Sequence, residues 1–263
     1  MKKISSRENE TFKLLKSLSI AKGRAESGLC IIEGEKIIAE NLESVSQVFI
    51  REGACGPVGI DSTGIEIIHL SPKLYDEIST LENCPGIMAT SKIPPTNPVS
   101  YPLLVLDSIH DPGNMGTLLR TALAFGFRTV VCIFCVGVYS QKVIRSAMGA
   151  QFKLNTLTIN HEGFLESAKT GELRDATFVM ADLDGKPPDE IKPLVKGKKL
   201  ALVLGNEGNG IDPQIKSLGE KVVTIPMTSD TDSLNVGVAG GILMYELKYV
   251  QDAQGGKNVQ RNL

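Results

Sequence analysis

The chain has 263 residues, 42% of them hydrophobic, and a formal net charge of −2. This length allows one large domain or two smaller ones, each with a hydrophobic core. The slightly acidic balance excludes the overall basic field that marks many nucleic-acid-binding proteins, so any contact with a nucleic acid must come from a local patch.

The N-terminus and the cysteines bear on the compartment. No apolar run approaches the length of a membrane span, and the opening MKKISSRENETF lacks the apolar region of a signal peptide. The five cysteines are odd in number and have no framework spacing, which suits a reducing compartment. We therefore expect a cytoplasmic protein with no membrane partner.

The first hundred residues predict a small α/β domain. Residues 4–18 have the pattern of an amphipathic helix, with Ser5 and Glu8 as a capping box. Further helices are predicted over residues 35–42 and 72–80, and strands over residues 29–32, 47–50, 65–70 and 87–90. We place this domain at residues 1–95, before the proline-rich linker KIPPTNPVSY.

Residues 100–252 predict a second, larger α/β domain. Short apolar runs predict strands over residues 103–106, 129–134, 154–159, 177–180, 200–204 and 222–225. Helices are predicted over residues 115–125, 142–148, 161–169 and 212–218, with a loop at residues 186–188. A last helix follows Asp232 or Ser233, either of which can serve as its N-cap.

The last helix carries an unusual face of small residues. Gly237, Gly240, Gly241 and Met244 recur at helical spacing, and each interior glycine costs about 0.5–1 kcal/mol relative to alanine. Either the helix lies close on a sheet, or backbone or a ligand approaches this face closely. The spacing alone leaves both open.

Three polar loops are expected to form one site. The segments 111–114, 205–207 and 225–235 each follow a predicted parallel strand, so they should meet at one edge of the sheet. Arg120, on the helix that starts from the first loop, can point back to this edge. Such a group of polar side chains can hold a phosphate and a hydroxyl.

Other motifs favour ordinary structure. Residues 205–210, GNEGNG, are neither the dinucleotide fingerprint nor a phosphate loop. Cys132 and Cys135 lie in the apolar run VVCIFCV, which favours buried strand cysteines pointing to opposite faces over a redox or metal pair. The three histidines have no metal-ligand spacing, and Ser233 has no evident triad partners, so we expect neither a metal site nor a serine hydrolase.

Taken together, the three loops resemble the motifs of the SpoU (TrmH) family of RNA 2′-O-ribose methyltransferases, within the SPOUT superfamily. The matching stretches are DPGNMGT with RTA (111–122), KVIRSAMGA (142–150), LGNEG (204–208), and IPM with SLNV and VA (225–239). The resemblance covers about residues 100–250. Upstream, IIEGEK (31–36) resembles, more loosely, the start of an L30e-like substrate-binding domain.

The resemblance implies a fold, a cofactor and an assembly. The expected fold is a C-terminal α/β trefoil-knot methyltransferase domain preceded by a small L30e-like α/β domain. Family members bind S-adenosylmethionine in the knot loops and act as homodimers through the knot domain. The implied partner is RNA, ribosomal RNA ahead of transfer RNA.

The resemblance also assigns roles to residues. The catalytic set it implies is Arg120, Asn114, Glu207, Ser233 and Asn235. The cofactor set is Leu204, Gly205, Asn206, Gly208, Ile225, Met227, Ser233 and Leu234. We expect RNA contacts from Lys13, Lys16, Lys22, Arg24, Lys36 and Arg145, although the basic run near the N-terminus could equally be a solvated face.

Two other functions remain as alternatives. A catalytically silent RNA-binding or ribosome-assembly protein could keep the same fold, but all five catalytic motif residues are present. A nucleotide-dependent oxidoreductase lacks its fingerprint. We expect an arginine to act as a cation that stabilises the developing alkoxide, because an arginine side chain stays protonated in proteins and is a poor general base.

Overall fold

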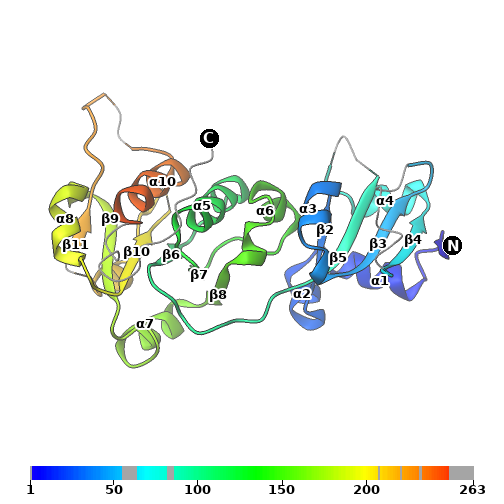
Figure 1. The fold of residues 1–263 in the computed structure, drawn as a ribbon, viewed down its shortest axis with the longest axis horizontal. Coiled ribbons are helices and arrows are strands. Elements are labelled where there is room, and N and C mark those ends of the chain that lie inside the picture. Colours follow the sequence, from blue (N-terminus) through cyan, green and yellow to red (C-terminus); the bar gives the residue numbers. More distant parts are fainter. Residues whose placement is uncertain are drawn as a thin grey trace. The chain divides into compact units, whose positions relative to one another are not determined.

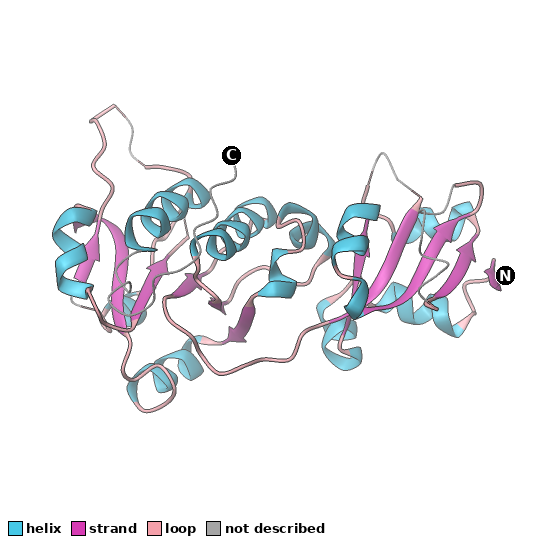
Figure 2. Ribbon diagram, viewed as in Figure 1, coloured by secondary structure: helices cyan, strands magenta, loops and turns pink. Residues whose placement is uncertain are grey.

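The computed structural model describes residues 2–54, 64–81, 86–206, 208–219, 221–230 and 233–248 (Figure 1). The chain divides into two compact units. The first unit holds residues 1–95 together with 136–153, and the second holds residues 96–135 together with 154–263. Both units combine helices with a β-sheet, which confirms the predicted α/β class (Figure 2). The domain limits expected from the sequence stay a prediction.

The first unit is built on a five-stranded mixed sheet with the order β1-β4-β3-β5-β2. Its strands are β1 (Lys2–Ile4), β2 (Leu29–Glu33), β3 (Val45–Arg51), β4 (Glu66–Leu70) and β5 (Ile87–Lys92). Its helices are α1 (Glu10–Ser17), α2 (Ala21–Ser27), α3 (Glu35–Glu40), α4 (Pro72–Ile78) and α6 (Gln141–Ser146), with 3₁₀ turns at Leu42–Ser44 and Ala150–Lys153.

Strand alternation gives this sheet two buried faces. Ile31 packs into one core with Phe49 and Ile68, while its neighbour Ile32 packs into the other core with Val48. The second core also takes in Ile144, which belongs to the mid-chain segment 136–153. The segment 136–153 therefore contributes to the core of the N-terminal unit.

The N-terminal helix differs from its prediction. Lys2–Ile4 pairs with β4 as an edge strand, and α1 begins at Glu10. Asn9, whose Oδ1 accepts from Thr11 N and Phe12 N, caps the helix in place of the expected Ser5 and Glu8 box. The amphipathic character is confirmed, because Phe12 and Leu15 are the buried residues of α1.

The second unit is built on a parallel sheet of six strands with the order β11-β9-β10-β6-β7-β8. The strands are β6 (Leu103–Asp107), β7 (Thr129–Ile133), β8 (Asn155–Ile159), β9 (Thr177–Lys186), β10 (Leu200–Leu204) and β11 (Lys221–Val223). The helices are α5 (Pro112–Phe125), α7 (His161–Lys169), α8 (Pro188–Val195), α9 (Pro213–Lys216) and α10 (Val236–Leu247). Every residue of β6, β7 and β10 is buried, as expected for central parallel strands covered on both faces.

Two boundaries in this unit correct the sequence analysis. The loop expected at residues 186–188 is short, because β9 continues to Lys186 and α8 begins at Pro188. The N-cap of α10 is Asn235, whose Oδ1 accepts from Gly237 N and Val238 N. Ser233 precedes the helix by three residues, and Asp232 lies outside the described residues.

The glycine face of α10 packs against a helix. A Cβ atom at Gly240 would lie 2.4 Å from Leu118 Cδ2 on α5 and 2.7 Å from Leu204 Cδ1 at the end of β10. A Cβ at Gly237 would lie 3.1 Å from Thr117 Cγ2. Of the two expected explanations, close packing on the sheet is met at the end of β10 by Leu204, but α5 supplies the other contact, and the atoms that approach Gly240 are side-chain carbons.

No described helix is long and apolar enough to cross a membrane.

Candidate functional site

A cavity of about 310 Å³ opens at the C-terminal edge of the parallel sheet of the second unit. Its walls come from the ends of β9, β10 and β11, from the loops that follow them, and from the start of α10. All eight residues predicted to bind the cofactor line it: Leu204, Gly205, Asn206, Gly208, Ile225, Met227, Ser233 and Leu234. Their binding role remains a prediction, but the structure brings all of them together.

The loop after β10 turns back on itself tightly. Asn206 N donates to Gly210 O (3.1 Å), and Gly210 N donates to Asn206 O (2.8 Å). Asn206 Oδ1 also accepts from Gly208 N at 2.7 Å. A Cβ at Gly205 would lie 2.2 Å from the carbonyl carbon of Gly210, so only glycine allows this close approach of two backbone segments.

Part of the cavity wall was not predicted from the sequence. Ala181, Asp182 and Leu183 line it because β9 runs beyond residue 180, where the apolar pattern had suggested that the strand ends. The remaining members are Gly210, Val223, Thr224, Val236, Ala239 and Leu243. A hydrogen bond from Lys216 lowers the pKa of the Asp182 carboxyl, so the wall carries one ionised acidic group.

Two of the predicted catalytic residues meet directly. Asn114 lies in the first turn of α5, where its backbone N donates to Asp111 Oδ1 at 2.7 Å. Asn235 Nδ2 donates to Asn114 Oδ1 at 2.8 Å. Asn235 stands between Leu234 and Val236, which both line the cavity, so this amide pair lies beside the cavity.

The other predicted catalytic residues are less constrained. Ser233 is exposed and lines the cavity. Arg120 is exposed on α5, lines no part of the cavity, and has no hydrogen-bond or ion-pair partner among the described residues. Glu207 lies outside the described residues, so its expected role in ordering the loops cannot be placed in the site.

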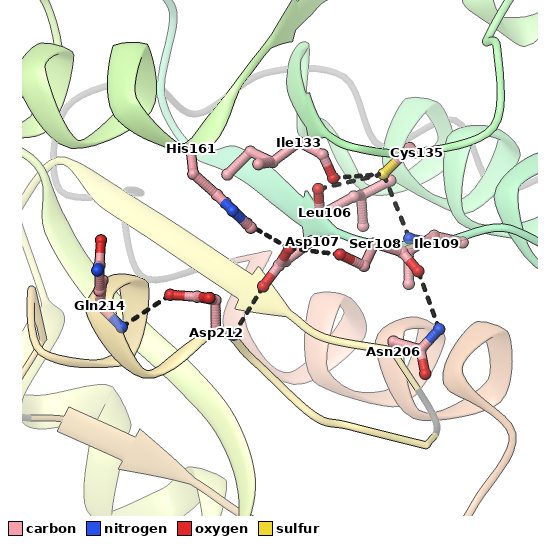
Figure 3. Close-up of polar contacts among 10 residues, drawn as sticks. All are labelled: Leu106, Asp107, Ser108, Ile109, Ile133, Cys135, His161, Asn206, Asp212 and Gln214. Carbon is pink, nitrogen blue, oxygen red and sulfur yellow. Dashed lines mark hydrogen bonds and ion pairs between the residues drawn. The ribbon is translucent and has the colours of Figure 1, made fainter.

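A buried carboxylate that the sequence analysis did not single out lies beside these loops (Figure 3). Asp107, the last residue of β6, is 1% exposed. Its Oδ1 accepts from Ser108 Oγ (2.9 Å) and contacts His161 Nε2 (3.1 Å). Its Oδ2 accepts from Asp212 N at 2.7 Å. Only the end of a strand run marked this position in the sequence.

The cysteine pair is arranged differently from its prediction. Cys132 is buried in β7, but β7 ends at Ile133, and Phe134, with φ of 50°, turns the chain back. Cys135 is half-buried beyond the strand, where its Sγ donates to Leu106 O (3.3 Å) or Ile133 O (3.4 Å), so the expectation of a buried strand cysteine is confirmed for Cys132 and wrong for Cys135. Cys135 Sγ also accepts from Ile109 N (3.4 Å), next to the loop that leads into α5.

The basic run of the N-terminal unit is largely neutralised by carboxylates. Lys13 pairs with Glu8 and Glu10, both at 3.1 Å, and Lys16 pairs with Glu77. Lys22 lies 3.8 Å from Glu26. These pairs are exposed, and they favour the solvated-face interpretation over a phosphate-binding surface for this part of the chain.

The other predicted RNA contacts divide into two kinds. Arg24 is 8% exposed and donates to Leu18 O at 2.9 Å, and burial lowers its pKa. That position does not favour contact with RNA. Lys36 and Arg145 are exposed, and Arg145 Nη1 donates to the Thr80 hydroxyl at 3.1 Å.

The described part of the chain holds no cluster of three or more histidine, cysteine, aspartate or glutamate side chains that could bind a metal ion.

Two protein-family models match the chain. The model described as the SpoU rRNA Methylase family matches residues 102–245. The model described as an MRM3-like substrate binding domain matches residues 9–89. The two matches cover the parts of the sequence that had suggested a methyltransferase domain and a substrate-binding domain.

Known relatives extend over nearly the whole chain. The 23S rRNA (guanosine(2553)-2′-O)-methyltransferase RlmP of Bacillus subtilis is 30% identical over 94% of this chain and 100% of its own length. A crystal structure described as an RNA 2′-O ribose methyltransferase has 27% identity and a TM-score of 0.73, covering 93% of this chain and 97% of that one. The AdoMet-bound rRNA methyltransferase of Sinorhizobium meliloti has 23% identity and a TM-score of 0.78, covering 94% and 97%, and shows a shared fold.

Proposed function

Since the chain belongs to the SpoU rRNA methylase family, we propose that it transfers a methyl group from S-adenosylmethionine to a ribose 2′-hydroxyl in RNA. Ribosomal RNA is the proposed substrate ahead of transfer RNA, because the full-length relative RlmP is named for methylation of 23S rRNA. One observation carries the proposal: the eight residues expected to bind the cofactor line one cavity next to the Asn114–Asn235 pair.

The cavity suits S-adenosylmethionine in size and chemistry. Its volume lies at the lower end of the range of about 300–1,000 Å³ that is usual for small-molecule sites. Leu204, Ile225 and Leu234 offer an apolar wall for the adenine ring, and the backbone around Gly205 offers hydrogen-bonding groups at close range. When bound there, the cofactor supplies an electrophilic methyl group on its sulfonium.

The side chains at the cavity edge then orient the ribose. We assign Ser233 and Asn235 to the 2′-hydroxyl, and the position of one in the cavity wall and of the other beside it supports this role. Asn114 fixes Asn235 through the 2.8 Å hydrogen bond. We assign Arg120 to the RNA phosphate and to the developing alkoxide, because a guanidinium without a described partner can serve both.

The proposal includes a trefoil knot and a homodimer. The contacts of α10 with α5 and with the end of β10 support a chain end that threads tightly through the loops. Val238, Ile242 and Tyr245 form an exposed apolar stripe on α10, from 37% to 53% exposed, which fits a partner subunit. Ile242→Glu should convert the dimer to a monomer in analytical ultracentrifugation, with Lys169→Glu, an exposed residue at the end of α7, as the control.

The test is methyl transfer to defined RNAs. Purified protein and radiolabelled S-adenosylmethionine are incubated with ribosomal RNA or transfer RNA from a strain that lacks the gene, and the modified nucleotide is mapped. We expect label in a ribose 2′-O-methyl group of ribosomal RNA. Cofactor binding without transfer to either RNA would favour the catalytically silent RNA-binding alternative, and label confined to transfer RNA would correct the substrate.

A further inference from the structure

The loop after β10 is held at two points by one short segment at the end of β6. We define the cofactor loop as residues 205, 206 and 208–212, four of which (Gly205, Asn206, Gly208 and Gly210) line the cavity. Near its start, Asn206 Nδ2 donates to Ser108 O at 3.0 Å. At its end, Asp212 N donates to Asp107 Oδ2 at 2.7 Å. Figure 3 shows both contacts.

The segment that holds the loop is itself fixed. Asp107 is paired with Ile133 in the parallel ladder between β6 and β7. Ser108 N donates to Ile133 O at 2.8 Å, and Ser108 has φ of 59°, which directs its carbonyl to Asn206. Asp107 and Ser108 are therefore a rigid support at the sheet edge, and the cofactor loop is the part that depends on it.

The Asp107 carboxylate divides its two oxygens between different tasks. Oδ1 contacts Ser108 Oγ and His161 Nε2. Oδ2 has one described partner, the backbone N–H of Asp212. Asp212 in turn caps α9, with its Oδ1 accepting from Gln214 N at 2.8 Å.

We infer that Asp107 is a positioning residue for cofactor binding: its Oδ2 holds Asp212 N, and through it the cofactor loop, in the conformation that forms the cavity. The inference rests on the proposed function of that cavity. Without this bond the loop populates other conformations, and the apparent affinity falls by the fraction of molecules that remain competent to bind. The methyl-transfer step itself does not involve Asp107.

The first test replaces the carboxylate. In Asp107→Ala, the dissociation constant for S-adenosylmethionine should rise by about 10- to 100-fold, as expected when a buried bond to a charged acceptor is lost. The rate at saturating cofactor should stay within about threefold of the parent, because only the binding-competent population changes. Asp107→Asn should restore affinity, since its oxygen can still accept from Asp212 N while its NH₂ faces Ser108 Oγ and His161, which can both accept.

A second test removes the donor and leaves Asp107 in place. Asp212 has φ of −51°, close to the value of about −65° that proline imposes. Asp212→Pro loses both the N–H and the side-chain cap, whereas Asp212→Ala loses only the cap. We expect Asp212→Pro to bind S-adenosylmethionine about 10-fold more weakly than Asp212→Ala, and this pair decides the matter if Asp107→Ala does not fold.

His161→Phe is the matched control, because it removes a partner of Oδ1 and leaves the Oδ2 bond. It should bind the cofactor like the parent. Parent affinity in Asp107→Ala, equal affinities in the two Asp212 variants, or a loss in His161→Phe as large as in Asp107→Ala would each overturn the inference. A parent protein that binds no S-adenosylmethionine would instead overturn the proposed function.

Discussion

Arg120 is an exposed arginine on α5, a helix whose other side is buried. Its proposed role depends on contact with the bound RNA. Arg120→Ala should lower single-turnover methyl transfer by about 10²–10³-fold, the usual loss when a preorganised charge at a transition state is removed. Arg120→Lys should recover little activity, because lysine keeps the charge but loses the planar fork.

The control for Arg120 is Arg128→Ala, which removes an exposed arginine near the far end of the same helix. Cofactor affinity and melting temperature should be unchanged in both alanine variants. If Arg120→Ala methylates RNA within a few-fold of the parent, the assignment of Arg120 to the transition state is wrong.

Cys135 should be the most reactive of the three described cysteines. The hydrogen bond from Cys132 lowers the pKa of Cys135, while burial raises the pKa of Cys30 to about 12. Because the thiolate is the nucleophile, Cys135 should be alkylated by iodoacetamide at neutral pH, and its labelling should fade as the pH falls through its lowered pKa. Mass spectrometry of the labelled peptides measures this.

Cys132→Ala supplies the comparison. It removes the stabilising hydrogen bond, so the pKa of Cys135 should return upward and its labelling at neutral pH should slow. Equal labelling of Cys30 and Cys135 in the folded parent would contradict the predicted order.

At the level of elements, alanine substitutions at two glycines of α10 distinguish the effect of close packing from that of helix propensity. Gly240→Ala places a methyl 2.4 Å from Leu118 and 2.7 Å from Leu204, both fully or almost fully buried, and should destabilise the protein by about 1–3 kcal/mol. Gly241→Ala meets only Thr121 Cγ2 at 3.8 Å and should stabilise it by about 0.4–1 kcal/mol.

Urea unfolding of the two glycine variants gives the free energies directly. Both variants add one methyl group to adjacent residues of one helix. If their changes in unfolding free energy have opposite signs, the difference comes from the close contact of Gly240 with Leu118 and Leu204. If both variants destabilise the protein equally, the close contact of α10 with α5 does not limit residue size at position 240.

The predictable elements were those with a strong local signal. The central strands β6, β7 and β10 were found from continuous apolar runs, and α5 was found with its end at Gly126, whose φ of 84° only glycine adopts readily. The continuation of β9 beyond residue 180 was missed because its later residues are polar and partly exposed.

The site was predictable where its residues follow strands directly. The cavity wall from β10 and β11 came from the loop motifs, but Asp107 did not, because an aspartate at a strand end has no local mark of burial. The position of Cys135 outside the strand was also hidden, since it depends on the backbone of Phe134. Such features follow from tertiary packing, which a single sequence pattern does not encode.

At the level of the whole molecule, RNA binding should depend on cations without carboxylate partners. Lys36→Gln and Arg145→Gln should each weaken binding and lower the slope of log affinity against log salt by about 0.7–0.9, the value for one lost phosphate contact. Lys13→Gln should change little, because Lys13 already pairs with two glutamates. Titrations with the substrate RNA at several salt concentrations measure the slope for all three variants.

Point variants are the appropriate form of this experiment. Deleting residues 1–95 would leave Ile144 without the core in which it packs, so the loss of RNA binding would be mixed with a loss of folding. If Lys13→Gln reduces the salt slope as much as Arg145→Gln, the helix α1 face is part of the RNA surface.

The assignment of residues 136–153 to the first unit has a consequence for protein synthesis. The ribosome delivers residues 1–95 well before the segment that covers one face of their sheet, at about 5–20 residues per second. During those seconds the nascent chain presents Ile32, Val48 and their neighbours without Ile144. The core of the N-terminal unit therefore cannot be complete until residues 136–153 have left the ribosome. A chaperone that binds exposed apolar surface on the nascent chain can do so during that interval.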